Sequence, residues 1–228
     1  MKLNASLVID FDSTIIKEET LEMIAEEALE AHPYGNKIRH KIEEITDMGM
    51  RGFISFSDSL ESRVKLFTAN KNSINKIKTK IDKKISDSFL KNQSFFKENG
   101  EKIFIVSGGF KDCVVPVAKE LSIPEENIFA NDFVFNSAEE IISIDKEKFL
   151  AQDRGKVKQV EALNILGHCC VIGDGYTDYQ IKEDGMANYF IAYTEHKKRP
   201  EVCRECDFEA NNFNEVMDIL NGLKFIEK

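Results

Sequence analysis

Short runs of consecutive apolar residues alternate along the chain with segments in which apolar residues recur every three or four positions. Four such runs cover residues 7–9, 103–106, 170–172 and 190–192. The periodic segments at 114–121 and 213–220 are typical of amphipathic helices. Buried strands alternating with such helices predict an α/β fold, a Rossmann-like, mostly parallel sheet with helices on both faces. Residues 132–135 and 140–144 predict a short hairpin at one sheet edge.

Residues 17–84 interrupt this alternation, because they contain helical patterns and no convincing strand. One apolar stripe lies within residues 21–29. A second stripe comprises Ile74, Ile77, Ile81 and Ile85. A helical block inserted after the first strand cannot join the sheet. We therefore predict a small all-helical cap over residues 17–84 and a discontinuous catalytic core of residues 1–16 and 85–228. The cap is expected over the carboxyl end of the first strand, where open α/β sheets bind ligands.

The composition is that of a folded, acidic protein. The chain has 228 residues, of which 42% are apolar and 31% charged, so it can bury a full core. Its formal net charge of −9 gives no basic surface for sequence-independent binding of nucleic acid. No apolar run approaches the ~20 residues of a membrane-spanning helix, and no signal-like segment opens the sequence, so we predict a cytoplasmic protein.

The five cysteines do not predict a disulfide framework, because their number is odd and two of them are adjacent. Cys203 and Cys206 have the spacing of half a zinc site. No second pair with this spacing completes such a site, so we expect ordinary reduced thiols.

Acidic, glycine and hydroxyl residues gather where the predicted strands end. They are Asp10 and Asp12 after residues 7–9, Ser107, Gly108 and Gly109 after 103–106, and Asp174, Thr177 and Asp178 after 170–172. Glycines before a helix favour close approach of an anion, while paired carboxylates suit a hard divalent cation. Each motif alone would fit an ordinary strand end or turn. Their joint occurrence at matching positions predicts one active site.

The order of these motifs resembles that of the haloacid-dehalogenase-like phosphatases, and the resemblance extends from Leu7 to about Phe213. Residues 12–19, 106–110 and 127–131 are similar to segments of the phosphoserine phosphatase family in particular. The resemblance implies Mg²⁺-dependent hydrolysis of a small phosphomonoester, O-phosphoserine, to serine and phosphate through an aspartyl phosphate.

The resemblance also assigns roles that match the needs of phosphoryl transfer, namely a nucleophile, charge neutralisation and a proton for the leaving group. Asp10 would be the nucleophile, and Asp12 would act as general acid and then base. The other implied roles are phosphate binding by Ser107, Gly108, Gly109 and Lys156, Mg²⁺ binding by Asp10, Asp174 and the backbone carbonyl of Asp12, and orientation of the metal shell by Asp178.

Phosphoserine carries an ammonium and a carboxylate beside its phosphate. The resemblance points to Glu19 for the ammonium and Arg63 for the carboxylate, which a guanidinium can bind through two hydrogen bonds. Met50 and Phe56 would pack beside them, and Thr177 would also contact the substrate. An alternative interpretation makes Glu19 a favourable charge at a helix start and Arg63 a solvated residue of a helix face.

The chain departs from the family pattern at two places. Residues 152–155 contain less glycine before Lys156 than expected, and Tyr176 and Tyr179 are bulky for the last motif. These departures leave open a related phosphatase or a phosphotransferase that acts on another small phosphomonoester. A non-catalytic, receiver-like phospho-acceptor domain is a more distant alternative, and it would have no use for the acid/base at Asp12.

Overall fold

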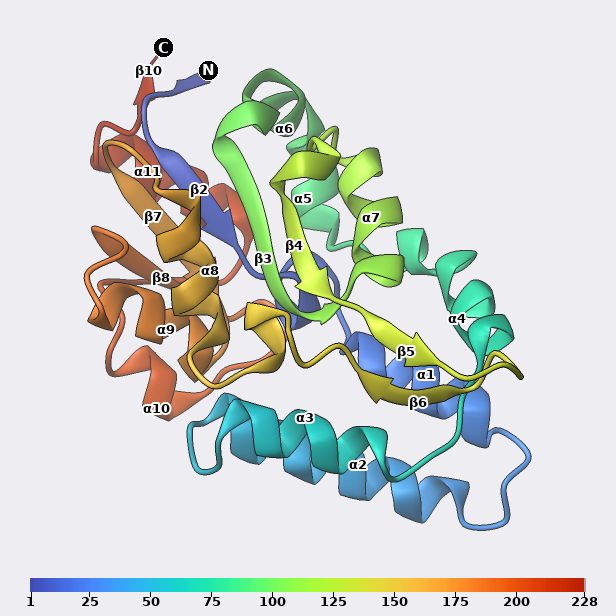
Figure 1. Ribbon diagram of the computed structural model, residues 1–228. Helices are drawn as coiled ribbons and strands as arrows, with labels where there is room; N and C mark the ends of the chain where they lie inside the picture. Colours follow the sequence, from blue (N-terminus) through green and yellow to red (C-terminus); the bar gives the residue numbers. More distant parts are fainter. Residues whose placement is uncertain (228) are drawn as a thin grey trace.

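The computed structural model describes residues 1–227, which form one six-stranded sheet with helices on both faces and a helical cap at one end (Figure 1). The strands lie in the order β4–β3–β2–β7–β8–β9, and every neighbouring pair is parallel. Their bounds are Ser6–Ile9 (β2), Ile103–Phe110 (β3), Ile128–Asn131 (β4), Cys169–Gly173 (β7), Tyr189–Tyr193 (β8) and Phe208–Ala210 (β9). The predicted α/β architecture is confirmed.

Successive residues of the central strand β2 face two different hydrophobic cores. Leu7 and Ile9 belong to the larger core and Val8 to the smaller one. The larger core is covered by α5 (Asp87–Lys91), α6 (Gln93–Asn99), α7 (Lys111–Glu120) and α11 (Phe213–Gly222). The smaller one is covered by α8 (Gly155–Leu163), α9 (Tyr176–Glu183) and α10 (Pro200–Cys203). Burial on both faces explains why the strand sequences are apolar without alternation.

The strand register brings the sequence motifs to one edge of the sheet. Ile9 pairs with Ile105 of β3 on one side and with Ile172 of β7 on the other. Because the three strands are parallel and in step, the residues that follow them leave the sheet together. Asp10 and Asp174 therefore start from neighbouring positions.

The remaining strands are short and lie outside the main sheet. The predicted hairpin is present as β5 (Phe133–Phe135) and β6 (Ile141–Ile144). Its second strand contacts the cap, where Ile141 N donates to the Ala69 carbonyl at 2.8 Å. The chain ends form an antiparallel pair, β1 (Lys2–Leu3) with β10 (Ile226–Glu227). Sequence analysis did not predict this pair, β4 or β9, which have two to four residues each.

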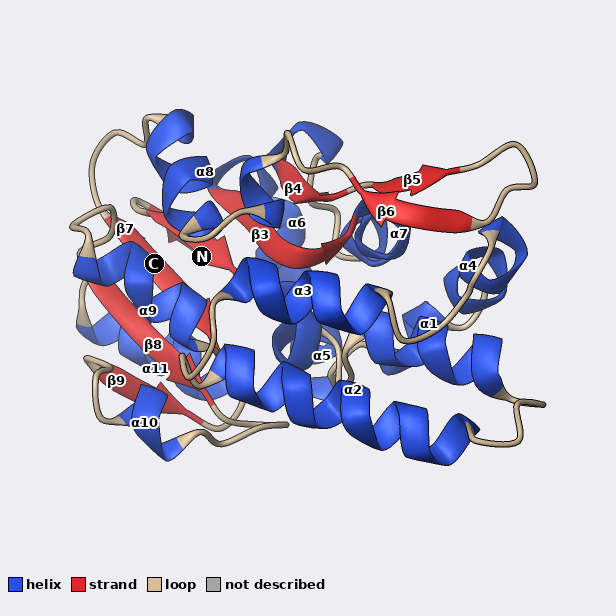
Figure 2. Cartoon of the chain, turned by 60° about the horizontal axis from the view of Figure 1, so that its bottom comes forward, coloured by secondary structure: helices blue, strands red, loops and turns tan. Residues whose placement is uncertain are grey.

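The cap consists of four helices that follow the first strand, as the sequence predicts. They are α1 (Thr20–Leu29), α2 (Gly35–Met50), α3 (Phe56–Val64) and α4 (Lys71–Lys78). Figure 2 shows α2 and α3 side by side in front of the sheet, on the side where the strands end.

The stripe of four isoleucines is not one helix. Helix α4 contains Ile74 and Ile77 and ends at Lys78, where the Thr79 hydroxyl donates to the Lys76 carbonyl at 2.8 Å. Ile81 lies in a separate short helical turn, and Ile85 is extended and bridges to Ile16. The helical prediction fails here because the chain must return to the sheet beside its exit point, whatever its local periodicity.

The two crossings between cap and sheet lie side by side. Lys17 N donates to the Lys84 carbonyl, and Ser86 N donates to the Ile15 carbonyl, each at 2.9 Å. The domain boundaries at residues 16–17 and 84–85 stay a prediction. Among residues 1–227, no helix is both long and apolar enough to cross a membrane.

An aromatic cluster under the sheet anchors α11. The Phe213 ring is fully buried, with its centroid 4.6 Å from that of Phe89 and 4.8 Å from that of Phe96. We predict that Phe213→Ala lowers the free energy of unfolding by about 3–5 kcal/mol in urea titrations, because it leaves a cavity. Leu166→Ala, at a side chain 86% exposed, is the control and should change it by less than about 0.5 kcal/mol. Equal effects would contradict this account of the core.

Candidate active site

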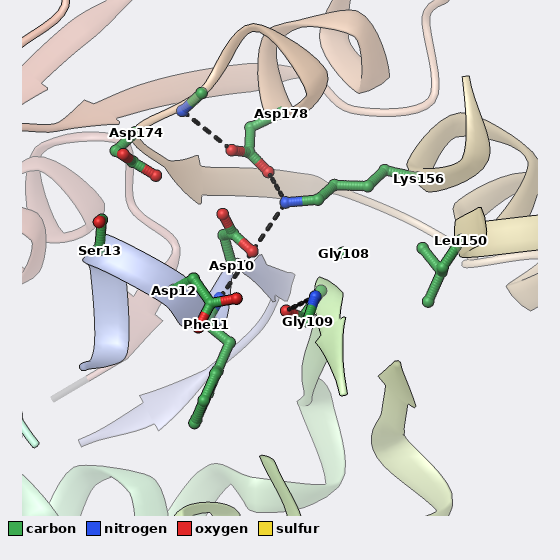
Figure 3. A network of polar contacts seen from close by, with 12 residues as sticks. Asp10, Phe11, Asp12, Ser13, Gly108, Gly109, Leu150, Lys156, Asp174 and Asp178 are labelled. Carbon is green, nitrogen blue, oxygen red and sulfur yellow. Dashed lines mark hydrogen bonds and ion pairs between the residues drawn. The ribbon is translucent and has the colours of Figure 1, made fainter. Parts of the chain in front are cut away.

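The Lys156 ammonium lies between two buried carboxylates at the end of the sheet. Its Nζ is 2.7 Å from Asp10 Oδ1 and 2.8 Å from Asp178 Oδ1 (Figure 3). The second oxygen of Asp178 accepts a hydrogen bond from Gly175 N at 3.1 Å. Lys156 is the second residue of α8 and is only 5% exposed, so it is not a solvated lysine at a helix start.

Asp10 occupies the position where β2 gives way to a wide, non-helical turn, Phe11–Ile15. The backbone N–H of Phe11 donates to Asp10 Oδ1 at 2.7 Å, which holds the carboxylate over the strand end. Within the turn, Ser13 has a positive φ of 54°. This reversal buries the side chains of Asp12 and Ser13 instead of leaving them on the surface.

Asp12 is fixed to the first helix of the cap. Its two carboxylate oxygens accept hydrogen bonds from the backbone N–H of Thr20 at 2.9 Å and from the Thr20 hydroxyl at 3.1 Å. Next to it, the Ser13 hydroxyl donates to Glu19 Oε1 at 2.7 Å. The start of α1 is therefore bonded directly to the segment that follows β2.

The structure offers one group of side chains suited to a divalent cation among residues 1–227. Oxygen atoms of Asp10, Asp174 and Asp178 all lie within 4.8 Å of one another and are buried. Arg199 pairs with Oδ2 of Asp174, whereas Asp174 Oδ1 is buried without a hydrogen-bond partner in the protein. Three hard oxygen donors with an unpartnered oxygen among them fit Mg²⁺.

Burial and mutual repulsion perturb the titration of these groups. Burial raises the pKa of Asp10 to about 7, with a contribution from Asp178 and opposition from Lys156. Burial also raises the pKa of Asp174 to about 6, against the effect of Arg199. For Asp12, burial and then the Glu19 carboxylate hold the pKa well above its usual range. Burial opposes the charge of Lys156, yet attraction to Asp10 and Asp178 leaves its pKa raised.

The segment Ser107–Gly109 passes closely under the cap. A Cβ atom on Gly108 would lie 2.4 Å from Cζ of Phe56, and one on Gly109 would lie 2.6 Å from Oδ2 of Asp12. Neither position therefore has room for a side chain. The fully buried Ser107 hydroxyl accepts a hydrogen bond from Gly109 N at 2.9 Å and so shapes this turn.

A small pocket lies between the cap and the strand ends. Its lining includes Asp10, Asp12, Glu19, Met50, Phe56, Arg63, Gly108 and Gly109. The pocket measures about 10 Å³, the space of roughly one water molecule. The structure thus brings most of the predicted site residues round one small space. Thr177 lies apart from it, in a second small pocket beside Lys156 and Phe56, with its buried hydroxyl unpartnered.

Arg63 is buried and is held by neutral acceptors. Its Nη1 donates to the Thr46 hydroxyl at 3.2 Å and its Nε to the Ser59 carbonyl at 3.3 Å. Glu19 is also buried, at 3% exposure. The alternative interpretation of Arg63 as a solvated residue is therefore wrong. Glu19 does stand at the start of α1, where its charge also favours the helix dipole.

Sequence analysis did not identify several residues that shape this site. Thr20 supports Asp12, Thr46 supports Arg63, and Arg199 pairs with Asp174. Glu22 faces the same region of the cap, where burial raises its pKa to about 7. Thr20 follows Glu19 directly and Glu22 lies one helical turn further on, so both could have been included. Arg199 and Thr46 belong to no motif, and only the folded chain brings them to the site.

Comparisons with known proteins agree with this geometry. Over 218 residues the chain is 28% identical to "Phosphoserine phosphatase, chloroplastic" of Arabidopsis thaliana, covering 93% of this chain and 70% of that protein. A solved phosphoserine phosphohydrolase-like protein from Francisella tularensis is 35% identical, with a TM-score of 0.86 over 95% of this chain and 99% of that one. A phospho-aspartyl intermediate analogue of phosphoserine phosphatase shares the fold, with a TM-score of 0.71 at 23% identity over 94% and 98% of the two chains.

The family match covers the region that carries the site except for Arg199, which lies beyond it. The haloacid dehalogenase-like hydrolase family matches residues 7–182, from the first strand of the sheet to helix α9. This span contains the three aspartates, the cap and Lys156. The chain is related in sequence to phosphoserine phosphatases, and it belongs to the haloacid dehalogenase-like hydrolase family.

Proposed function

We propose that this phosphatase hydrolyses O-phosphoserine to serine and phosphate through an aspartyl phosphate on Asp10. The observation that carries the proposal is the small pocket that has Asp10 and Asp12 on the core side and Glu19 and Arg63 on the cap side. Two groups for phosphoryl transfer thus face two opposite charges that match an α-amino acid. The relatives from Arabidopsis and Drosophila, each 28% identical, are named phosphoserine phosphatases.

Asp10 is the proposed nucleophile. Its carboxylate attacks phosphorus, and the ester oxygen of the substrate departs on the opposite side. Lys156, within 2.7 Å of this carboxylate, keeps it oriented and supplies positive charge for the phosphate oxygens. The narrow turn at Gly108 and Gly109 lets the backbone approach the same phosphate.

Asp12 is the proposed general acid and base. A leaving alkoxide needs a proton, and the raised pKa of the Asp12 carboxyl suits it to carry one. Two hydrogen bonds from Thr20 hold the carboxyl in position. After serine leaves, the same group takes a proton from the water that hydrolyses the aspartyl phosphate.

Mg²⁺ is the proposed cofactor, held by the side chains of Asp10 and Asp174 and the backbone carbonyl of Asp12, with Asp178 orienting the site. When bound, the cation offsets repulsion between the nucleophilic carboxylate and the phosphate dianion. Asp178 is suited to orientation because Lys156 and Gly175 N already occupy its two oxygens.

The cap residues are proposed to select the amino-acid end. Glu19 would bind the ammonium and Arg63 the carboxylate, with Met50 and Phe56 packed around them and Thr177 beside the phosphate. The pocket measures only about 10 Å³ in this conformation. We therefore propose that the cap moves away from the strand ends before binding and closes again for chemistry.

The first test concerns the two aspartates. Asp10→Asn should abolish turnover, because an amide does not attack phosphorus, while the circular dichroism spectrum stays that of the wild type. Asp12→Asn should slow turnover by roughly 10²-fold or more through loss of the general acid and base. Phosphate release measured with purified variants checks both. Near-wild-type turnover by a verified Asp10→Asn protein would refute its role as nucleophile.

The second test concerns the cation. Activity should disappear in EDTA and return with Mg²⁺, while Ca²⁺ should inhibit because its looser, higher coordination distorts in-line geometry. Calorimetric titration should show that Asp174→Asn weakens Mg²⁺ binding. Glu209→Gln, which alters an acid paired with Lys198, is the control and should bind Mg²⁺ normally. Full activity in excess chelator would exclude Mg²⁺.

The third test separates phosphoserine from other esters. Arg63→Ala should lower kcat/KM for phosphoserine. The loss should correspond to about 2–4 kcal/mol of transition-state stabilisation, the scale of a lost buried charge pair. The same variant should hardly affect p-nitrophenyl phosphate or phosphoethanolamine, which have no carboxylate. Glu19→Gln should instead spare esters that have no ammonium. Equal losses on all esters would mean that these residues hold the cap together and that another small phosphomonoester is the substrate.

A further inference from the structure

Asn131 joins two parts of the site that come from distant segments. It is the last residue of β4 and is fully buried. Its Nδ2 donates to the Gly108 carbonyl at 2.9 Å and to the Leu150 carbonyl at 3.1 Å. Gly108 belongs to the tight turn at the end of β3, and Leu150 lies in the short helical turn Phe149–Ala151 that precedes α8.

The bond from Asn131 to the Gly108 carbonyl lies where the backbone pairing of β3 and β4 is irregular. β3 and β4 pair in register from Ile105 with Ile128 to Val106 with Phe129, and the register then shifts before Phe110 pairs with Asn131. Between these two pairs, β3 advances by four residues while β4 advances by only two. The extra residues of β3 fall in the Ser107–Gly109 turn, where the Asn131 side chain supplies the donor to the Gly108 carbonyl.

The second bond fixes the segment that carries Lys156. A Cβ atom on Gly155 would lie 2.1 Å from the Phe149 carbonyl oxygen, so the turn at Phe149–Ala151 packs tightly against the first residue of α8. Gly155 N also donates to the Gln152 carbonyl at 3.1 Å. A displacement of Leu150 would consequently be passed to the start of α8 and to the Lys156 ammonium.

The chemistry of the side chain shows why an asparagine stands here. Its Oδ1 is buried without a partner in the protein, which is unfavourable for a polar atom. Leucine would fill a similar volume without that penalty, but it would leave two buried carbonyls without their donor. The residue is thus useful for its two N–H groups.

We propose that Asn131 is a positioning residue that sets the distance between the Gly108–Gly109 backbone and the Lys156 ammonium, so that both can bind one phosphoryl group. This inference rests on the proposed function, which makes these two segments the phosphate-binding groups. Positioning matters because a misplacement of about 1 Å in a catalytic site can reduce the rate by roughly 10²-fold.

Asn127 provides a matched control on the same strand connection. It is also a buried asparagine, it precedes β4, and its Nδ2 donates to the Gly100 carbonyl at 3.0 Å, away from the residues of the site. Asn127→Leu and Asn131→Leu each remove a buried amide that bonds to backbone carbonyls. A purely structural role predicts that the two variants behave alike.

The experiment measures inhibition by inorganic phosphate, kcat/KM for phosphoserine and for p-nitrophenyl phosphate, and unfolding in urea. For Asn131→Leu we expect kcat/KM to fall about 10- to 100-fold, equally for both esters, and phosphate inhibition to weaken about as much. Asn127→Leu should lose stability but keep both quantities close to the wild type. Asn131→Asp, which keeps the shape but replaces the N–H donors by a carboxylate, should also lose phosphate affinity and serves if Asn131→Leu does not fold.

The outcomes separate this proposal from the proposed function. Phosphate inhibition within about twofold of the wild type in the Asn131 variants, or losses matched by Asn127→Leu, would overturn the positioning role. If the wild-type protein does not hydrolyse phosphoserine but does hydrolyse another phosphomonoester, the proposed substrate is rejected. The role of Asn131 is then tested on that other ester. A wild-type protein that neither binds phosphate nor hydrolyses any phosphomonoester would reject both.

Discussion

The burial of Asp10, Asp174 and Asp178 at the end of one sheet is the constraint on which the rest of the site depends. Three carboxylates within 4.8 Å repel one another, and burial deprives each of water. Lys156 offsets part of this charge by bonding to Asp10 and Asp178, and Arg199 does the same for Asp174. This cluster of buried charges is unfavourable for the stability of the fold. It would suit a site that binds a cation together with a phosphate group.

The cap is more than a cover, because its first helix is bonded to the catalytic segment. Thr20 holds the Asp12 carboxylate, and Glu19 accepts a hydrogen bond from Ser13. Any movement of α1 that admits a substrate therefore acts on the proposed acid/base and on the proposed ammonium ligand together. This coupling gives a physical reason why closure over the substrate and readiness for proton transfer would coincide.

Glycine permits the close packing that this arrangement requires. At Gly108 the Phe56 ring occupies the space of a side chain, and at Gly109 the Asp12 carboxylate does so. Asn131 then secures the Gly108 carbonyl, which the shifted register of β3 and β4 leaves to a side-chain donor. This segment is consequently narrow and fixed, which suits the phosphate-binding role proposed for its backbone.

The α/β class, the helical cap and the gathering of the aspartate and glycine motifs could be predicted from the sequence, because continuous apolar strands and 3.6-residue periodicity are local patterns. The prediction of one helix for the four-isoleucine stripe was wrong, since the return of the chain to Ile16 overrides local helical preference. Only the folded chain shows that Lys156 and Arg63 are buried, that Arg199 pairs with Asp174 and that Asn131 bonds to the Gly108 and Leu150 carbonyls. Their partners lie far away in the sequence, and a hydrogen bond or ion pair between distant segments leaves no periodic signal in either one.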